Sequence, residues 1–432
     1  MKITGQLGID KKRFDKIKKN IKDILDFKKV VEKESQGETT ELLESCLLGA
    51  INLDSSDVHI EIEKDKVKIR LRIDGLLHDA AILELKPYDL LLSRIKLLSG
   101  IKLNINKKAQ DGRFTVLFED VSIEVRVSTL PSEYGETIAL RILNPKNLIE
   151  IEDLGVEKKM VDILEKEIRQ PNGIIIASGP TGGGKTTTLY AILKKIQNSE
   201  LKIITIEDPI EYHLKGISQT QTKPKEGYDF PNGLMAIMRQ DPDVILVGEI
   251  RDLETAKISL QASLTGHLVL TTIHSNDATG VVARLGALGE KLTNIASAIN
   301  LVIGQRLVRK VCPKCSTFSP PSKNEMKLLK DDLASVLKDF DIPSIDENLK
   351  IPHLAKGCSF CNFTGYKGQV GIFEFFLVDS YMENFILKSP SSVDLRKEAQ
   401  KRGMITMREY GLIKVLRGMT TIEEINRVTK SH

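Results

Sequence analysis

Residues Gly179–Thr186 have the sequence Gly-Pro-Thr-Gly-Gly-Gly-Lys-Thr, which fits the pattern G-x-x-x-x-G-K-[ST] at every fixed position. An apolar run over 173–177 precedes this stretch, and a helix-compatible sequence follows it over 187–196. A strand, a glycine-rich loop and a helix in this order let successive backbone N–H groups converge on phosphate oxygens. The stretch therefore predicts a phosphate-binding loop at the start of a helix, against the alternative of a chance glycine-rich turn.

The predicted loop carries two side chains with defined chemistry. Lys185 would supply positive charge to the β- and γ-phosphates of a nucleoside triphosphate, and the Thr186 hydroxyl would ligate Mg²⁺. We therefore expect ATP and Mg²⁺ as ligands. The residues predicted to bind the nucleotide are Gly179, Pro180, Thr181, Gly182, Gly183, Gly184, Lys185, Thr186 and Thr187.

The chain around this loop has the pattern of an α/β domain. Short continuous apolar runs at 203–206, 244–247 and 268–270 alternate with helix-like segments. This alternation is typical of a parallel sheet covered by helices on both faces. We expect the domain to span residues 151–432, with a helical region over about 378–432.

Two acidic residues are expected beside the loop. In open parallel sheets the ligand crevice lies at the carboxyl ends of the strands, where Glu207 and Glu249 follow two predicted strands. Gly248 stands where ordinary phosphate-loop ATPases carry an aspartate, so Glu249 would serve the Mg²⁺ ion or polarise the attacking water. Either glutamate alone could be an ordinary helix-start acid. Their roles as general base and Mg²⁺-associated carboxylate stay open between the two.

Two histidines bracket a predicted central strand over 268–273. His267 precedes the strand and His274 follows it. Single histidines beside strands are usually structural, but their placement at a central strand makes a γ-phosphate sensor the functional alternative.

Four of the five cysteines form two C-x-x-C pairs. Two such pairs supply four thiolates, enough for a closed tetrahedral Zn²⁺ site, and a structural zinc module is expected over about 310–365. Cys46 stands apart and is expected to be a buried small apolar residue. The predicted zinc ligands are Cys312, Cys315, Cys358 and Cys361.

The first third of the chain predicts a separate α+β domain over 40–150. Apolar residues alternate with basic ones over 67–73, and Asp74-Gly75 then predicts a hairpin turn. The Lys-rich segment over 1–39 predicts an amphipathic arm and linker, whose alternatives are a packing helix and a membrane-surface contact.

Bulk composition limits the function classes. The 432 residues include 63 basic and 59 acidic ones, giving a net charge of +4, and only 5% are aromatic. Balanced charge and few stacking side chains argue against nucleic acid as a partner. The sequence contains no apolar run long enough for a transmembrane helix, and its first residues lack a signal-peptide pattern, so we expect a cytoplasmic protein.

These motifs together resemble the secretion ATPase superfamily that drives type IV pilus assembly and type II secretion. The resemblance covers about residues 40–432. It rests on three stretches of the predicted ATPase domain and three of the domain before it, namely Ile204–Tyr212 (ITIEDPIEY), Met238–Asp252 (MRQDPDVILVGEIRD), Thr265–His274 (TGHLVLTTIH), Ser56–Ile60 (SDVHI), Arg72–Gly75 (RIDG) and Gln110–Arg113 (QDGR).

The resemblance implies a RecA-like ATPase domain, a preceding PAS-like domain and a homo-hexamer. It also implies that arginines of the PAS-like domain, here Arg113, Arg126 and Arg141, reach the nucleotide. Such motors work on an inner-membrane platform protein, so we expect peripheral association with the inner face of the membrane. The cysteine pairs favour an assembly or secretion motor over a retraction motor.

Other functions stay open from the sequence alone. A DNA-uptake pseudopilus would use the same motor as pilus assembly and type II secretion. RecA-like nucleic-acid translocases are a different class, which the charge balance disfavours. A non-hydrolysing scaffold is a third alternative, which Lys185, Thr186, Glu207 and Glu249 oppose.

Overall fold

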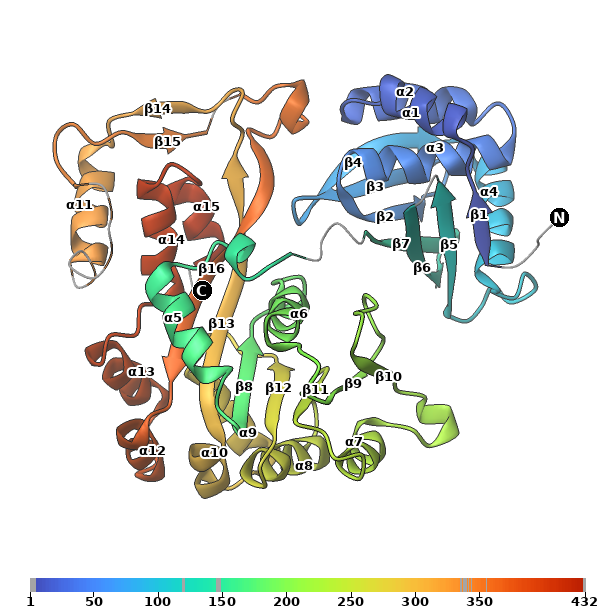
Figure 1. Ribbon diagram of the computed structural model, residues 1–432. Coiled ribbons are helices and arrows are strands. Elements are labelled where there is room, and N and C mark those ends of the chain that lie inside the picture. Colours follow the sequence, from blue (N-terminus) through green and yellow to red (C-terminus); the bar gives the residue numbers. More distant parts are fainter. Residues whose placement is uncertain are drawn as a thin grey trace. The chain divides into compact units, whose positions relative to one another are not determined.

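The contacts of the chain divide it into two compact units. Unit 1 contains residues 1–146, 312–316 and 354–368, and unit 2 contains residues 147–311, 317–353 and 369–432. Residues 1–4, at the start of the predicted arm, lie outside the described residues. The computed structural model describes residues 5–118, 121–144, 149–334, 336, 340, 342, 344–354 and 356–429 (Figure 1).

Unit 1 is built on a seven-stranded sheet in the order β1-β5-β6-β7-β2-β3-β4. Strands β1 and β5 are parallel, and the other neighbouring strands are antiparallel. Its elements are β1 (Gln6–Gly8), α1 (Lys11–Asn20), α2 (Ile24–Glu34), α3 (Thr39–Asn52), β2 (Ser55–Ile62), β3 (Val67–Ile73), β4 (Leu76–Leu83), α4 (Leu85–Ser99), β5 (Gln110–Phe118), β6 (Val121–Ser132) and β7 (Gly135–Leu143).

The predicted hairpin is confirmed in strands β3 and β4. Burial alternates along β3, because its apolar residues face the core of unit 1 and its basic residues face outward. The turn between the strands places Asp74 at φ 49° and Gly75 at φ 82°. Two consecutive positive φ values match the twist of a tight hairpin, and Asp-Gly tolerates them well.

The Lys-rich start of the chain forms helices that pack. Helix α1 begins after Asp10, whose carboxylate accepts a hydrogen bond from the Arg13 N–H, and α2 begins after Asp23 in the same way. Ile17 and Phe27 are fully buried in the core of unit 1. The apolar face of this segment is therefore used for packing, the first of the two alternatives drawn from the sequence.

Unit 2 is built on a sheet in the order β10-β9-β11-β12-β8-β13-β16, and its strands from β10 to β13 run parallel. The α/β class predicted from the sequence is confirmed for this unit. Its elements are η2 (Glu152–Leu154), α5 (Lys158–Glu167), β8 (Gly173–Ser178), α6 (Lys185–Ile196), β9 (Ile203–Glu207), β10 (Ser218–Gln221), η3 (Pro224–Glu226), α7 (Phe230–Met238), β11 (Val244–Val247), α8 (Leu253–Leu264), β12 (Leu268–Ile273), α9 (Gly280–Leu288), α10 (Leu292–Ala298), β13 (Ile299–Val311), β14 (Thr317–Ser319), α11 (Lys323–Leu333), β15 (Ile351–His353), β16 (Tyr366–Leu377), α12 (Ser380–Leu387), α13 (Ser392–Lys401), α14 (Met407–Leu416) and α15 (Ile422–Thr429).

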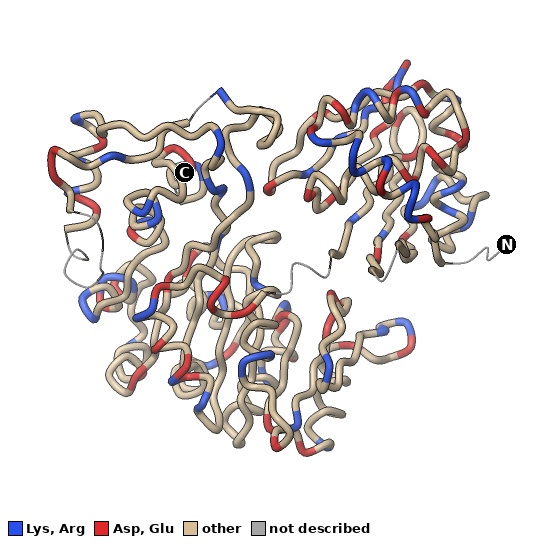
Figure 2. The backbone as a smooth tube through the Cα atoms, turned by 45° about the horizontal axis from the view of Figure 1, so that its top comes forward, with Lys and Arg blue, Asp and Glu red and all other residues tan. Residues whose placement is uncertain are grey.

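The central strands of unit 2 are apolar on both faces. Ile174 belongs to one buried cluster and Ile175, the next residue of β8, belongs to another. Figure 2 accordingly shows the charged residues of this unit concentrated on its helices and loops. Burial on both faces explains the continuous apolar runs by which the sequence predicted these strands.

A buried ion pair attaches the last helix to the sheet. The Glu424 carboxylate on α15 accepts hydrogen bonds from Arg309 Nη2 on β13 at 2.7 Å and from Arg427 Nε at 2.8 Å. Burial alone would raise the pKa of Glu424, but the hydrogen bonds from the two guanidinium groups outweigh it and lower the pKa to about 2.

Replacing Glu424 with Gln should destabilise the protein in a pH-dependent way. The folded-state pKa is depressed, so the stabilisation is complete above the unfolded-state value near 4.5 and disappears as the pH falls toward 2. We expect Glu424→Gln to lower the free energy of unfolding by about 3 kcal/mol at pH 7, and by progressively less below pH 4.5. Urea unfolding of both proteins across this pH range measures the difference in their free energies of unfolding. Glu423→Gln, at an exposed position of the same helix, should have little effect; an equal loss there would contradict the assignment.

Candidate nucleotide site and metal centre

The predicted phosphate loop joins β8 to α6 as the sequence indicated. Gly179, Gly182 and Gly184 adopt positive φ values of 147°, 75° and 84°. A Cβ atom on Gly179 would lie 2.3 Å from the carbonyl oxygen of Gln305, and one on Gly184 would lie 2.7 Å from Gln305 Nε2. Only glycine satisfies both the backbone angles and this close approach to β13.

Lys185 begins α6 and is almost fully buried. Its Nζ donates hydrogen bonds to the carbonyl oxygens of Gly179 at 2.8 Å and Pro180 at 3.0 Å. Burial lowers the pKa of Lys185, while the charge of Glu249 opposes this shift. A partly desolvated ammonium group at the start of a helix is well suited to bind the phosphates of a nucleotide. Thr186 and Thr187 follow it in the first turn of the same helix.

Glu249 and His274 converge on this loop from the neighbouring strands. Glu249 follows β11 and pairs with Arg251, and its Oε2 lies 3.8 Å from His274 Nε2. Burial lowers the pKa of His274 and Lys185 lowers it further, while Glu249 and a hydrogen bond with the Gly179 backbone oppose the shift. His274 is therefore mostly neutral at pH 7, so it can donate a hydrogen bond without adding a full positive charge.

The structure places Glu207 in a different environment from Glu249. Its buried carboxylate accepts hydrogen bonds from the Tyr190 hydroxyl, from Thr205 Oγ1 at 2.6 Å and from Gln219 Nε2 at 3.2 Å. Burial raises the pKa of Glu207, although these three donors oppose the shift. None of these three partners belongs to the phosphate loop. They link β9 to α6 and β10, so the role of Glu207 as a general base stays a prediction.

Packing gives a physical reason for the glycine at position 248. A Cβ atom there would lie 3.3 Å from both the Glu207 Cα and the Ile206 carbonyl oxygen on the adjacent strand. Thr272 Oγ1 donates a hydrogen bond to the Gly248 carbonyl oxygen at 2.8 Å. A side chain at the end of β11 would therefore require the adjacent backbone of β9 to shift slightly.

The two histidines around β12 lie at opposite ends of the strand. His267 precedes the strand, and its Nδ1 lies 3.0 Å from the carbonyl oxygen of Ala262. Because a strand rises about 3.3 Å per residue, roughly 20 Å separate His267 from the carboxyl ends of the sheet where His274 lies. The structure brings His274 to the phosphate loop of the same chain and does not bring His267 there.

One residue of the site was not predicted from the sequence. Gln305 on β13 is 1% exposed and accepts a hydrogen bond from Thr188 Oγ1 at 2.7 Å. Gln305 packs against the phosphate loop, because its backbone lies close to Gly179 and its side chain lies close to Gly184. The available signal was that Gln305 directly follows the apolar run Leu301–Gly304 of β13, because a polar residue that continues a buried strand requires a buried partner.

The three predicted arginines lie side by side on the sheet of unit 1. Arg113 on β5 is directly opposite Arg126 on β6, which is directly opposite Arg141 on β7. The structure therefore brings together on one sheet three residues that are well separated in sequence.

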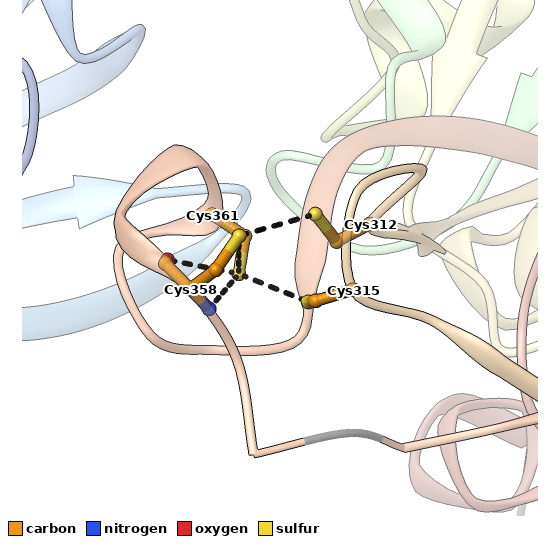
Figure 3. A group of neighbouring side chains, drawn as sticks. All are labelled: Cys312, Cys315, Cys358 and Cys361. Carbon is orange, nitrogen blue, oxygen red and sulfur yellow. Dashed lines mark hydrogen bonds between the residues drawn. The ribbon is translucent and has the colours of Figure 1, made fainter.

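The four cysteines of the C-x-x-C pairs lie within 4.8 Å of one another and face a common centre (Figure 3). The Sγ–Sγ distances are 3.9 Å for Cys312–Cys358 and 3.8 Å for Cys315–Cys361. A tetrahedral ZnS₄ site with bonds of about 2.3 Å has edges of about 3.8 Å, so the four sulfur atoms fit this metal.

Backbone amides favour the thiolate form of one of these cysteines, Cys361. The N–H groups of Cys358 and Gly365 donate to Cys361 Sγ at 3.1 Å and 3.3 Å. Burial would raise the pKa of Cys361, but these hydrogen bonds hold it below its usual range. Cys46 is fully buried on α3, where burial raises its pKa to about 12. The thiol therefore stays protonated, which agrees with the predicted role of Cys46 as a buried small apolar residue.

The cysteine segments make their contacts within unit 1. The Asn362 side chain accepts a hydrogen bond from the N–H of Ile24, the first residue of α2. Lys367 Nζ lies 3.0 Å from the Asp54 carboxylate, and the Gly368 N–H donates to Asp74 at 2.9 Å. The sequence predicts these segments within the ATPase domain over 151–432, and the boundaries of that domain stay a prediction.

Comparison with known proteins identifies the family. Residues 32–427 match the profile of the family described as "Type II/IV secretion system protein". The chain belongs to this family. The "Type II secretion system ATPase E" of Vibrio cholerae is 40% identical over 403 residues, covering 93% of this chain and 77% of that protein. The "Type IV pilus assembly ATPase PilB" of Thermus thermophilus is 39% identical over 373 residues, covering 86% of this chain and 41% of that protein.

A solved structure has a similar fold. The Legionella pneumophila ATPase DotB matches with a TM-score of 0.64 at 20% identity, covering 89% of this chain and 94% of DotB. Together with the parallel sheet of unit 2, this similarity fits a RecA-like ATPase fold. Within the described parts of the chain, no helix has the length and apolar character needed to cross a membrane.

Removing the metal expected at the tetracysteine centre should destabilise the protein. Zinc bound by four thiolates contributes folding energy, so chelation should lower the melting temperature and increase proteolysis of residues 354–368. We expect about one zinc per chain by elemental analysis. Cys315→Ser should lose this zinc, and Cys46→Ala should retain it. A melting curve that is the same with and without metal would contradict a structural zinc site.

Proposed function

We propose that this chain is an ATP-hydrolysing motor of a type II secretion system or of type IV pilus assembly. The observation that carries the proposal is the convergence of a complete phosphate loop with Glu249 and His274 at the carboxyl ends of three neighbouring strands. Membership of the type II/IV secretion family supports the machine in which the motor works.

Within the site, the loop backbone and Lys185 bind the β- and γ-phosphates. Thr186 and Glu249 would hold Mg²⁺, which neutralises phosphate charge when it is bound. We infer that the neutral ring of His274 donates a hydrogen bond to the γ-phosphate when the nucleotide is bound. The attacking water also needs a carboxylate base, and the roles of base and Mg²⁺-associated carboxylate are divided between Glu207 and Glu249.

We further propose that the motor is a homo-hexamer in which Arg113, Arg126 and Arg141 act on the nucleotide of a neighbouring subunit. A guanidinium group that reaches the transferring phosphoryl group stabilises charge that develops in the transition state. We propose that unit 1 contains the PAS-like domain. Contacts made only when ATP is bound would shift a hinge equilibrium between the units and drive an inner-membrane platform protein.

Loss of the loop lysine tests the nucleotide site directly. Lys185→Ala should reduce ATP turnover to background without unfolding the protein, because the ammonium group contacts phosphate in both ground and transition states. Phosphate release measures turnover, and circular dichroism monitors the fold. Lys195→Ala removes the same charge from the other end of α6, where Lys195 pairs with Glu152, and should retain activity. Normal turnover in Lys185→Ala would disprove the loop assignment.

Mixing two inactive variants tests whether the arginines act between subunits. Lys185→Ala and Arg141→Ala chains should each be inactive or slow alone, but co-assembly should restore turnover. We call the interface between two neighbouring subunits a seam. In rings assembled at random from equal amounts of the two chains, about a quarter of the seams would pair an intact loop with an intact arginine from the neighbour.

The control mixes Lys185→Ala with chains that carry both substitutions, in which no seam has both groups. This mixture should stay inactive. If the first mixture also stays inactive although the chains co-assemble, Arg141 does not act across the seam.

A further inference from the structure

A continuous row of charged residues crosses the outer face of the unit 1 sheet. Strands β5, β6, β7, β2 and β3 are neighbours in this order (Figure 1). Residues directly opposite one another on antiparallel neighbours share a face. We call the following set the arginine row, whose members pair in register from strand to strand: Arg113, Arg126, Arg141, Asp57 and Arg72.

The row contains a single acidic residue. Arg113 and Arg126 are directly opposite each other, as are Arg126 and Arg141, and like charges in this position destabilise a sheet. Glu124 lies near the first two arginines, with its carboxylate 3.9 Å from Arg113 Nη1 and 3.6 Å from Arg126 Nε. A fold that keeps guanidinium groups together in this way is suited to bind an anion.

Asp57 is held on three sides. Its Oδ1 accepts a hydrogen bond from Arg141 Nε at 3.0 Å, and its Oδ2 lies 3.3 Å from Arg72 Nε. Ser56 Oγ donates to Oδ2 at 2.8 Å. Arg72 is itself fixed, because its Nη1 donates to the Gly75 carbonyl oxygen at 3.2 Å. The Asp57 side chain is only 11% exposed, whereas that of Arg141 is 53% exposed.

We propose that Asp57 is a positioning residue for Arg141, and that Arg72 and Ser56 hold Asp57 in place for this task. The inference rests on the proposed function, in which Arg141 stabilises charge on a neighbour's nucleotide. A long exposed arginine samples many rotamers, and a contact through Nε fixes the plane in which both Nη nitrogens lie. Asp57 thereby orients the phosphate-binding edge of Arg141 before the nucleotide arrives, which lowers the entropic cost of the transition-state contact.

A second ion pair on the same strands provides a matched control. Glu61 on β2 pairs with Arg70 on β3, on the same face of the sheet but outside the row. If Asp57 only stabilised the sheet, loss of either acidic residue should affect turnover alike. If Asp57 acts through Arg141, only its loss should slow the reaction.

The experiment measures kcat and KM for ATP in the assembled full-length protein. We expect Asp57→Ala to lower kcat about tenfold, the scale of one charge-assisted hydrogen bond, with KM for ATP nearly unchanged. In an Arg141→Ala background, Asp57→Ala should lower kcat no further. Asp57→Asn keeps an acceptor for Arg141 Nε and should recover part of the rate, while Glu61→Ala should keep the rate of the unmodified protein.

The outcomes separate the inference from the proposed function. A normal kcat in Arg141→Ala would overturn the arginine role itself. A lowered kcat in Arg141→Ala together with a normal kcat in Asp57→Ala would overturn only the inference. The inference would also be overturned if the double variant had a kcat lower than that of Arg141→Ala by the factor that Asp57→Ala causes alone. If Asp57→Ala fails to fold, Asp57→Asn replaces it in the double-mutant cycle with Arg141→Ala. Asp57→Asn should then lower kcat in the unmodified background and leave kcat unchanged in the Arg141→Ala background.

Discussion

The close approach of the glycine loop to Gln305 is the constraint on which the nucleotide site depends. Without side chains at Gly179 and Gly184, the backbone can lie against β13 and curl into the start of α6. This position sets Lys185 at the helix N-terminus and brings the loop beside the ends of β11 and β12. Glu249 and His274 lie next to the loop because each comes directly after the end of its strand. The chemistry is thus arranged by backbone packing before any side chain acts.

The two glutamates show how burial separates residues of the same type. Glu207 is enclosed by Tyr190, Thr205 and Gln219, so its carboxylate stabilises the contact between β9 and α6. Glu249 faces charged partners at the edge of the sheet and remains near the loop. Sequence position alone places both at the carboxyl ends of neighbouring strands, and only the surrounding groups show how their burial and hydrogen bonding differ.

Local patterns were predictable, and contacts between distant segments were not. The loop over 179–186, the hairpin turn at Asp74-Gly75 and the tetracysteine centre each follow from residue types at short spacings. The contact of Gln305 with the loop depends on how β13 packs, because a polar residue in a buried strand indicates that it has a partner but not which one. The separation of His267 from His274 needs the direction of β12 relative to the loop. The arginine row depends on strand register, which a sequence leaves open until the strand order is known.

The return of residues 312–316 and 354–368 to unit 1 has a consequence for the architecture of the chain. Asn362 supplies the acceptor for the first N–H of α2, and Gly368 and Lys367 bind the aspartates at two turns. Because these groups come from far along the sequence, no single peptide bond divides the molecule into two complete pieces. A fragment that ends near residue 146 would keep its sheet but lose these partners. To isolate the first unit intact, residues 312–316 and 354–368 would have to be joined to that fragment.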